Sequence, residues 1–396
     1  MTLRKLVGSR LAHVPSADWD LAHVGAAVST PAHAVRALEA AASTVLGVEC
    51  QAVGSARTAI WAALTTATDI RRVWVPGYTC VAVPNAVAAA GFEIRWVDVD
   101  GPNLDMGVVL SEGRPGDAVL AQHTYGVPVD PDAIDAARQQ GLYVIEDRAH
   151  RFDAAEAAGD AVVFSLEHSK VVSGGQGGLL HVAGADQAAA IVRLIGTLPQ
   201  DAAAGVRRIV LTSMGQLLFD WHAPVADRAG AAIRRALLRL PALSAEGQTA
   251  DELAGEGIVP RSLHPRLARL AERAIRRVDA NLAHRRRIAA IYRERLPALT
   301  PSWLPHDTPL VRYPLQVGDG DDVWRRVRRA GIDLGPRWFA APVHPAGSRS
   351  SYVDGLAPRA EALSRAVLTL PTHLRVSEGE AARIADAVTA ATRRAA

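Results

Sequence analysis

An amine and a carboxylate follow two successive apolar segments, in an arrangement that could hold an aldehyde cofactor. Lys170 comes soon after the apolar run 161–165 and directly before the glycine-rich run 174–178. Asp147 closes the apolar run 142–145. A lysine forms a Schiff base with the aldehyde of pyridoxal phosphate, and an acid holds the pyridine nitrogen protonated so that the ring accepts electrons. This pattern indicates a pyridoxal phosphate enzyme.

A phosphate would need a third group of residues, and the chain offers one where a helix is expected to begin after a short strand. Backbone N–H groups that are free at a helix start form an anion site, which the helix dipole reinforces. We expect amides from Ala56 and Arg57 and hydroxyls from Ser165 and Thr58, while the Arg57 side chain could face solvent or substrate. Ser55 also has the character of an N-cap, and the two roles are compatible.

Segments of strand and helix character alternate through the first half of the chain. Strands separated by helices of about ten residues indicate a parallel α/β sheet with helices on both faces. The expected strands are 51–54, 73–76, 93–97, 118–121, 142–145 and 161–165, and the expected helices are 34–45, 57–67, 81–90 and 131–140. Ligands of such sheets bind beyond the carboxyl ends of the strands, where we place Ser55, Tyr78, His123, Asp147 and Ser165.

The pattern changes after about residue 184, which suggests a second, smaller domain. We predict a large α/β domain over 1–245, with an apolar helical insert at about 200–245, and a small α+β domain over 246–396. The small domain is expected to begin with one long helix at 265–296, because apolar residues recur there at helical spacing over roughly 30 residues. The remaining expected elements are a strand at 310–317 and helices at 322–330 and 378–394.

Within the insert, the segment 209–240 is strongly apolar and its second half, 227–239, is basic and amphipathic. Such a helix can lie on an anionic membrane, so contact with a membrane surface through 226–240 is one interpretation. Packing in the core or at an interface is the commoner role of such a stripe. A lid over the substrate is a third interpretation.

Composition excludes several other classes of function. The 44 basic and 41 acidic residues nearly balance, so nucleic acid is not the expected partner. Cys50 and Cys80 make no disulfide framework, which suits a reducing cytoplasm. We find no signal peptide and no apolar run long enough to span a membrane.

Seven short motifs, in order, carry a resemblance to a known family. They are 54–59 (GSARTA), 75–80 (VPGYTC) with 85–87, 97–100 (VDVD), 123–126 (HTYG), 146–150 (EDRAH), 165–170 (SLEHSK) and 177–178. In this order and spacing the chain resembles the DegT/DnrJ/EryC1/StrS aminotransferases, which are sugar aminotransferases of fold type I. The resemblance implies a large domain with a mixed, mostly parallel sheet, a smaller α+β domain, pyridoxal phosphate and a homodimer.

The resemblance also assigns roles to individual residues. Lys170 would form the Schiff base and move the proton, Asp147 would pair with the pyridine nitrogen, and His150 would lie near the phenolic oxygen of the cofactor. Cys80 stands where the family has an aromatic residue stacked on the ring, so His123 or Tyr125 would have to cover that face, and Tyr78 would pack nearby.

Two further arginines are candidates for substrate contacts, together with Tyr125. Arg261 matches a family arginine that reaches the site of the neighbouring subunit, whereas Val259 replaces the asparagine that accompanies it. Arg337, in the turn 335–339, could line the mouth of the pocket.

Together these interpretations predict an aminotransferase that converts a ketone to an amine. The substrate would most plausibly be a nucleotide-linked keto-sugar, with an amino acid such as glutamate as the donor. A non-sugar substrate of a specialised biosynthetic pathway and a non-catalytic, regulatory relative are the alternatives. Dehydratases of the same fold carry histidine in place of the lysine, so Lys170 argues against them.

Overall fold

The computed structural model describes residues 33–154, 157–200, 203, 205–207, 209–210, 253–255, 257–332 and 334–393. The basic amphipathic stretch 226–240, and the apolar segment 209–240 beyond its first two residues, lie outside these described residues. The predicted domain boundary at 245–246 lies outside them as well, so the division into two domains stays a prediction. Among the described helices, none is both long and apolar enough to cross a membrane.

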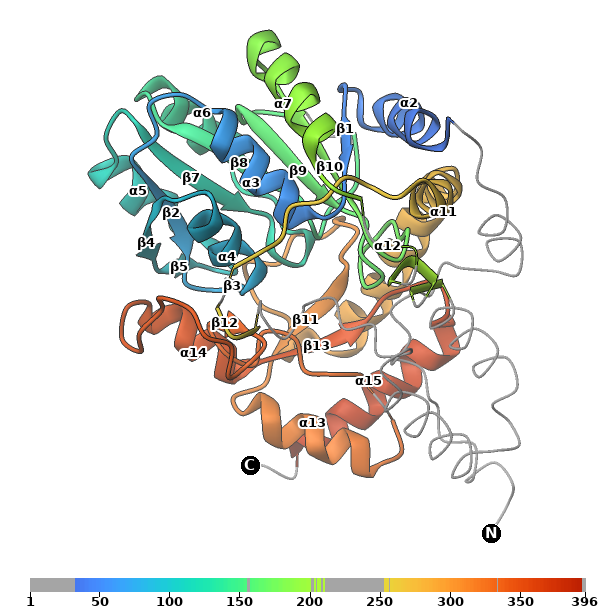
Figure 1. Cartoon of the computed structure of the whole chain (residues 1–396). Helices are drawn as coiled ribbons and strands as arrows, with labels where there is room; N and C mark the ends of the chain where they lie inside the picture. The colour runs from blue at the N-terminus through green and yellow to red at the C-terminus, as the bar shows by residue number, and fades with distance from the viewer. Residues whose placement is uncertain are drawn as a thin grey trace.

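A seven-stranded sheet forms the centre of the first half of the chain (Figure 1). Its strands pair in parallel except β10, which runs antiparallel to both of its neighbours. The fold is therefore α/β with a mixed, mostly parallel sheet, as predicted. In spatial order the strands are β1 (Gln51–Val53), β10 (Gly178–Val182), β9 (Ala161–Ser165), β8 (Tyr143–Asp147), β7 (Asp117–Gln122), β2 (Arg72–Pro76) and β4 (Glu93–Val97).

Helices cover both faces of this sheet, because alternate residues of each strand are buried on opposite sides. In β2, Val73 and Val75 pack under one layer of helices, whereas Trp74 packs under the other. The first layer comprises α3 (Ala56–Thr66), α4 (Ala82–Ala89) and α7 (Ala185–Thr197). The second comprises α5 (Met106–Glu112), α6 (Pro131–Gln139), α2 (Ala34–Leu46) and α11 (Pro265–Ile275).

The C-terminal part has its own apolar core around a two-stranded antiparallel sheet, which is formed by β11 (Arg312–Gln316) and β13 (Val367–Pro371). The helices α12 (Val278–Arg295), α13 (Gly320–Arg329), α14 (Pro358–Ala366) and α15 (Glu378–Arg393) surround it. Short elements complete the described fold: β3 (Thr79–Cys80), β5 (Val99–Asp100), β6 (Asn103–Leu104), β12 (Val343–His344) and the 3₁₀ turns Thr124–Gly126 and Pro297–Leu299.

The prediction of one long helix over 265–296 was wrong, because the chain breaks between α11 and α12. Arg277 leaves the helical conformation, with φ −115° and ψ 9°, and its N–H bonds to Ala274 three residues back. After the break, α12 begins in the core that α11 shares, where Val278 and Leu282 pack, and continues into the C-terminal core. Leu267 and Leu270 of α11 pack into the core beside α2, whereas Ile288 and Tyr292 of α12 pack into the C-terminal core.

Strand β10 was not predicted as a strand, because its first residue, Gly178, belongs to the glycine-rich run and only the short segment 179–182 follows it. The run reverses the chain after β9, and Gly175 and Gly177 adopt φ of 87° and 137°, which L side chains rarely tolerate. Backbone bonds between Leu166 and both Gly174 and Gly177 hold this reversal closed. The loop between the two strands, which carries Lys170, is thereby fixed at the carboxyl end of the sheet.

Candidate active site

Lys170 lies in the loop between β9 and β10 and is partly exposed. Its positive charge acts to lower the pKa of four surrounding groups: Asp147, Cys80, His150 and His344. These groups come from the ends of β8 and β3, from the loop after β8, and from β12 in the C-terminal part. The fold therefore gathers distant parts of the chain around one amine.

Asp147 is the last residue of β8, and its side chain is buried. Its Oδ1 accepts a hydrogen bond of 2.9 Å from the N–H of Ala149. Burial raises the pKa of Asp147, and the charge of Lys170 opposes that rise. Because β8 and β9 are adjacent parallel strands, Asp147 and the loop that carries Lys170 lie at the same edge of the sheet. The prediction that both residues act on one ligand stays a prediction.

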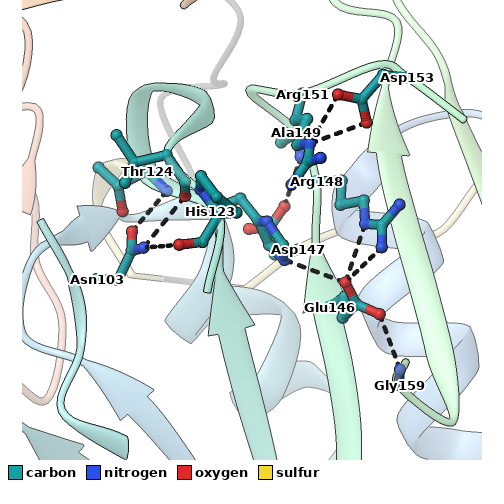
Figure 2. Close-up of polar contacts among 12 residues, drawn as sticks. Asn103, His123, Thr124, Glu146, Asp147, Arg148, Ala149, Arg151, Asp153 and Gly159 are labelled. Carbon is teal, nitrogen blue, oxygen red and sulfur yellow. Dashed lines mark hydrogen bonds and ion pairs between the residues drawn. The ribbon is translucent and has the colours of Figure 1, made fainter. Parts of the chain in front are cut away.

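Behind Asp147, a buried polar network fixes the end of β8 (Figure 2). Glu146 accepts hydrogen bonds from the Arg148 guanidinium at 2.7 and 2.9 Å and from the N–H of Gly159 at 2.8 Å. Burial opposes ionisation, but His123 and Arg148 lower the pKa of Glu146 to about 2. The backbone N–H of His123 bonds to the carbonyl of Asp147 at 3.0 Å, which ties β7 to the same point.

His123 belongs to this network rather than to the open part of the site. It is 2% exposed, and its Nε2 lies 3.1 Å from Oε2 of Glu146. Burial lowers the pKa of His123, so the ring is neutral near pH 7. The expectation that His123 covers the cofactor ring does not fit this position.

A hydrogen bond to His150 defines which of its ring nitrogens can donate a proton to a ligand in the site. Its Nδ1 accepts a hydrogen bond of 3.1 Å from the backbone N–H of Tyr125, so Nε2 carries the proton of the neutral ring. Burial and the charge of Lys170 lower the pKa of His150 well below its ordinary value, which keeps the ring neutral. Tyr125 points its N–H at His150 from a left-handed backbone conformation, with φ 61°.

The two tyrosines of the predicted site form a buried pair. The hydroxyls of Tyr78 and Tyr125 lie 2.6 Å apart, and both side chains are fully buried. Phe339 packs on both rings, with centroids 4.9 and 5.6 Å away. In this structure the pair forms a wall that supports His150. The contacts of Tyr125 with substrate and of Tyr78 with the cofactor stay predictions.

The predicted phosphate site lies where the start of α3 packs closely against β10. Ser55 caps α3 by accepting a hydrogen bond of 3.1 Å from the N–H of Thr58. A side chain at Gly178 could not be accommodated, since its Cβ would lie 2.6 Å from the backbone N of Ala56. Ser165 pairs directly with Gly178 across the two strands. The amides at the start of α3 and the Ser165 hydroxyl are thus neighbours, as a phosphate requires.

Thr58 and Arg57 differ in their access to this cradle. Thr58 is 1% exposed, and its hydroxyl lies 3.1 Å from that of Ser55 and accepts the N–H of Arg261 at 3.5 Å. It therefore serves the helix start rather than an open site. Arg57 is partly exposed, and its charge acts to lower the pKa of Cys80, which places the guanidinium on the same side as the site.

Cys80 borders the site from β3, where the C-terminal part reaches across. Strand β12 pairs in parallel with β3 and places His344 opposite Cys80. The Nδ1 of His344 accepts a hydrogen bond of 3.2 Å from the N–H of Phe339. Burial, followed by the charge of Lys170, lowers the pKa of His344 to about 4, so it is a neutral donor through Nε2. The small Cys80 side chain thus faces an imidazole from the other half of the chain.

The two arginines predicted to contact substrate are used elsewhere within this chain. Arg261 supports the start of α3, since its carbonyl accepts the N–H of Gly54 at 2.9 Å, and its guanidinium donates to the carbonyl of Gln200. Its predicted role in a neighbouring subunit stays a prediction, as does the effect of Val259, which is 66% exposed. Arg337 is buried and donates to carbonyls at the end of α14 and to Asp321, and its assignment to the pocket mouth stays a prediction.

Three residues around Lys170 were not assigned by sequence reasoning. Glu167 accepts the N–H of Ser169 at 3.1 Å and pairs with His168, and its pKa stays below its ordinary value despite burial. Its position two residues beyond Ser165 in the same motif was the available signal. Trp338 and His344 come from a segment about 170 residues away in sequence. The turn 335–339, which contains Trp338, was predicted to line the pocket mouth, but no local signal singled out these two side chains as neighbours of Lys170.

Parts of the chain are similar in sequence to characterised aminotransferases. The chain is 31% identical over 217 residues to the L-glutamine:2-deoxy-scyllo-inosose aminotransferase of Streptoalloteichus tenebrarius, over 52% of this chain and 48% of that protein. It is 33% identical over 171 residues to the L-glutamine:scyllo-inosose aminotransferase of Streptomyces griseus, over 39% of this chain and 40% of that protein. The chain spans about half the length, or less, of these relatives.

Solved structures share the fold at lower identity. DesV of S. venezuelae, solved in complex with a ketimine intermediate, superposes with a TM-score of 0.72 at 23% identity, over 94% of this chain and 95% of that one. The sugar aminotransferase Spr1654 of Streptococcus pneumoniae, in its PMP-form, gives a TM-score of 0.73 at 15% identity, over 98% and 99%. The sequence profile of one family matches residues 23–204 and 263–389, which is most of the chain. The protein is a member of the DegT/DnrJ/EryC1/StrS aminotransferase family.

Proposed function

We propose that this protein is a pyridoxal phosphate-dependent aminotransferase that converts the ketone of a hydroxylated six-membered ring to an amine. The ring is either a cyclitol, as in the inosose aminotransferases, or a nucleotide-linked keto-sugar, and glutamine or glutamate is the donor. The observation that carries the proposal is that the buried Asp147, at the end of β8, and Lys170, in the loop after the adjacent parallel strand β9, share the carboxyl end of the sheet.

The residues around Lys170 fit pyridoxal phosphate. Gly178 leaves space for the close approach of β10 to the amides that begin α3, and Ser165 adds a hydroxyl there. These groups would hold the phosphate. Asp147 would hold the pyridine nitrogen, and the Nε2–H of His150 would donate to the phenolic oxygen. Each polar group of the cofactor therefore has a partner of the right charge.

The cofactor, when bound, supplies an aldehyde for amine exchange and a ring that accepts electrons. The protein supplies the proton chemistry and the orientation. Lys170, once released from the cofactor, is the amine that takes a proton from one carbon and returns it to another. Asp147 keeps its negative charge against a cationic ring nitrogen in a dry environment, where the interaction is strong. Neutral His150 orients without carrying charge.

A homodimer is part of this proposal. The family resemblance places Arg261 at the site of a neighbouring subunit, and within its own chain Arg261 instead lines the start of α3. Val259, two residues before Arg261, is exposed. It would then contact the neighbouring subunit without the side-chain amide of the asparagine that the family has at this position. A non-sugar ketone as substrate remains the alternative within the same chemistry.

The cofactor claim can be tested on a chain with two lysines, Lys5 and Lys170. The purified protein, loaded with pyridoxal phosphate, is reduced with borohydride, digested and analysed by mass spectrometry. We expect the added mass on Lys170, a visible absorption band in the parent and in the control Lys5→Arg, and neither in Lys170→Ala. Labelling of Lys5 alone, or an unchanged spectrum in Lys170→Ala, would refute the proposal.

A further inference from the structure

Three consecutive residues of the C-terminal part, Arg337, Trp338 and Phe339, approach the site in different ways. Arg337 is anchored by hydrogen bonds to the carbonyls of Val367 and Arg365. Phe339 is 3% exposed and packs among aromatic side chains, and its N–H is held by His344. Trp338, between these two anchors, is partly exposed. Arg337 and Phe339 are therefore held in place, whereas the side chain of Trp338 between them faces the site.

The indole of Trp338 is presented directly to Lys170. The Lys170 amine lies 5.2 Å from the ring centroid, in the range of a cation–π contact. The ring of His150 stacks on the indole at 5.5 Å with an interplanar angle of 27°. The guanidinium of Arg312, on β11, also lies 5.2 Å from the indole centroid. An apolar face is thus fixed beside the reacting amine by contacts with both halves of the chain.

We propose that Trp338 is the surface on which the ring of the keto substrate rests, and that it determines which ketones the enzyme accepts. This inference rests on the proposed function. A carbon that reacts with the amine lies about 3 to 3.5 Å from it. A six-membered ring bound at that carbon, on the side of the amine that faces Trp338, then lies against an indole centred 5.2 Å from the same amine.

The chemistry of the two substrates predicts a selective effect. A hydroxylated six-membered ring turns a face of C–H groups outward between its hydroxyls, and an aromatic face is the surface that matches it. The amino-acid donor is an open chain with a carboxylate and has no such face. Trp338 should therefore contribute to binding of the ring and little to binding of the donor.

The test separates the two half-reactions in the loaded enzyme. Trp338→Phe keeps an aromatic face, and Trp338→Leu keeps apolar volume without one. We expect Trp338→Leu to raise the KM for the ring ketone about 10-fold, Trp338→Phe to raise it less, and both to leave the KM for the amino donor unchanged. A cyclitol ketone and a nucleotide-linked keto-sugar are tested separately, because the variant must affect whichever one the parent uses.

Binding without turnover gives a second measurement. In the Lys170→Ala protein, the Kd of the ring ketone by calorimetry should rise about 10-fold when Trp338→Leu is added. Trp96→Phe is the matched control, since Trp96 lies on the edge strand β4 and bonds to Ser351; it should change neither constant.

The outcomes separate the two proposals. An active parent whose Trp338 variants keep the ketone KM and Kd would overturn the role of Trp338 alone. Equal losses for ketone and donor would also overturn it, because they would indicate a structural role. A parent that transfers no amino group to either ring ketone, although it forms the Lys170 adduct, would overturn the proposed substrate class instead.

Discussion

Gly178→Ala should weaken cofactor binding through a displacement that can be worked out from the structure. A Cβ at this position would lie 2.6 Å from the backbone N of Ala56 and from the carbonyl carbon of Ser55, whereas ordinary contacts begin at 3.4 Å. The start of α3 would have to move by roughly 0.8 Å, at a cost of about 1–3 kcal/mol for overpacking. Because the same amides are proposed to hold the phosphate, we expect the Kd for pyridoxal phosphate to rise by roughly 5- to 150-fold, the factor that corresponds to this cost.

The assay is a titration of the protein with pyridoxal phosphate, followed by absorbance and paired with denaturant unfolding without the cofactor. Gly184→Ala is the control, because its Cβ would meet only the Cβ of Gln187, at 3.8 Å, and should change neither quantity. If Gly178→Ala binds the cofactor as tightly as the parent does, the phosphate is not held at the start of α3 and the assignment of this cradle is wrong.

Two other perturbations test the buried end of β8. Asp147→Asn keeps the shape of the side chain but removes its charge, so kcat should fall roughly 100- to 1,000-fold while the cofactor still binds. Asp153→Asn is the control, because it disrupts only the nearby pair with Arg151 and should leave kcat unchanged. Equal losses of kcat in the two variants would exclude a specific role for Asp147. Glu146 has a folded-state pKa of about 2 against an ordinary 4.5. Ionised Glu146 should therefore contribute fully to the free energy of unfolding above about pH 4.5, and this contribution of about 3 kcal/mol should be lost as the pH falls through 2. Acid unfolding followed by circular dichroism checks this, and Glu146→Gln should abolish that part of the pH dependence; an unchanged acid profile in the variant would contradict the network.

Local patterns predicted much of the large sheet because its determinants are short-range. The expected strands at 93–97 and 161–165 match β4 and β9, and the terminal helix ends within one residue of its prediction. Runs of apolar residues between turn-forming residues encode such elements directly. Strand β10 was not predicted, because the glycines at and before its start hide its strand character. These glycines allow the close approach to α3 and the reversal of the chain.

The sequence by itself determined which residues could do the chemistry, because the order of its motifs singled out Lys170 and Asp147. The structure places Asp147 and the loop of Lys170 at the carboxyl ends of adjacent strands. Only the tertiary structure decided what surrounds them. It buries Arg337 as an anchor, pairs Tyr125 with Tyr78, and sets Trp338 against the amine from a distant segment. The reason is physical: propensity and periodicity act over a few residues, whereas the side that an arginine or an indole faces depends on packing between elements that are far apart in the chain.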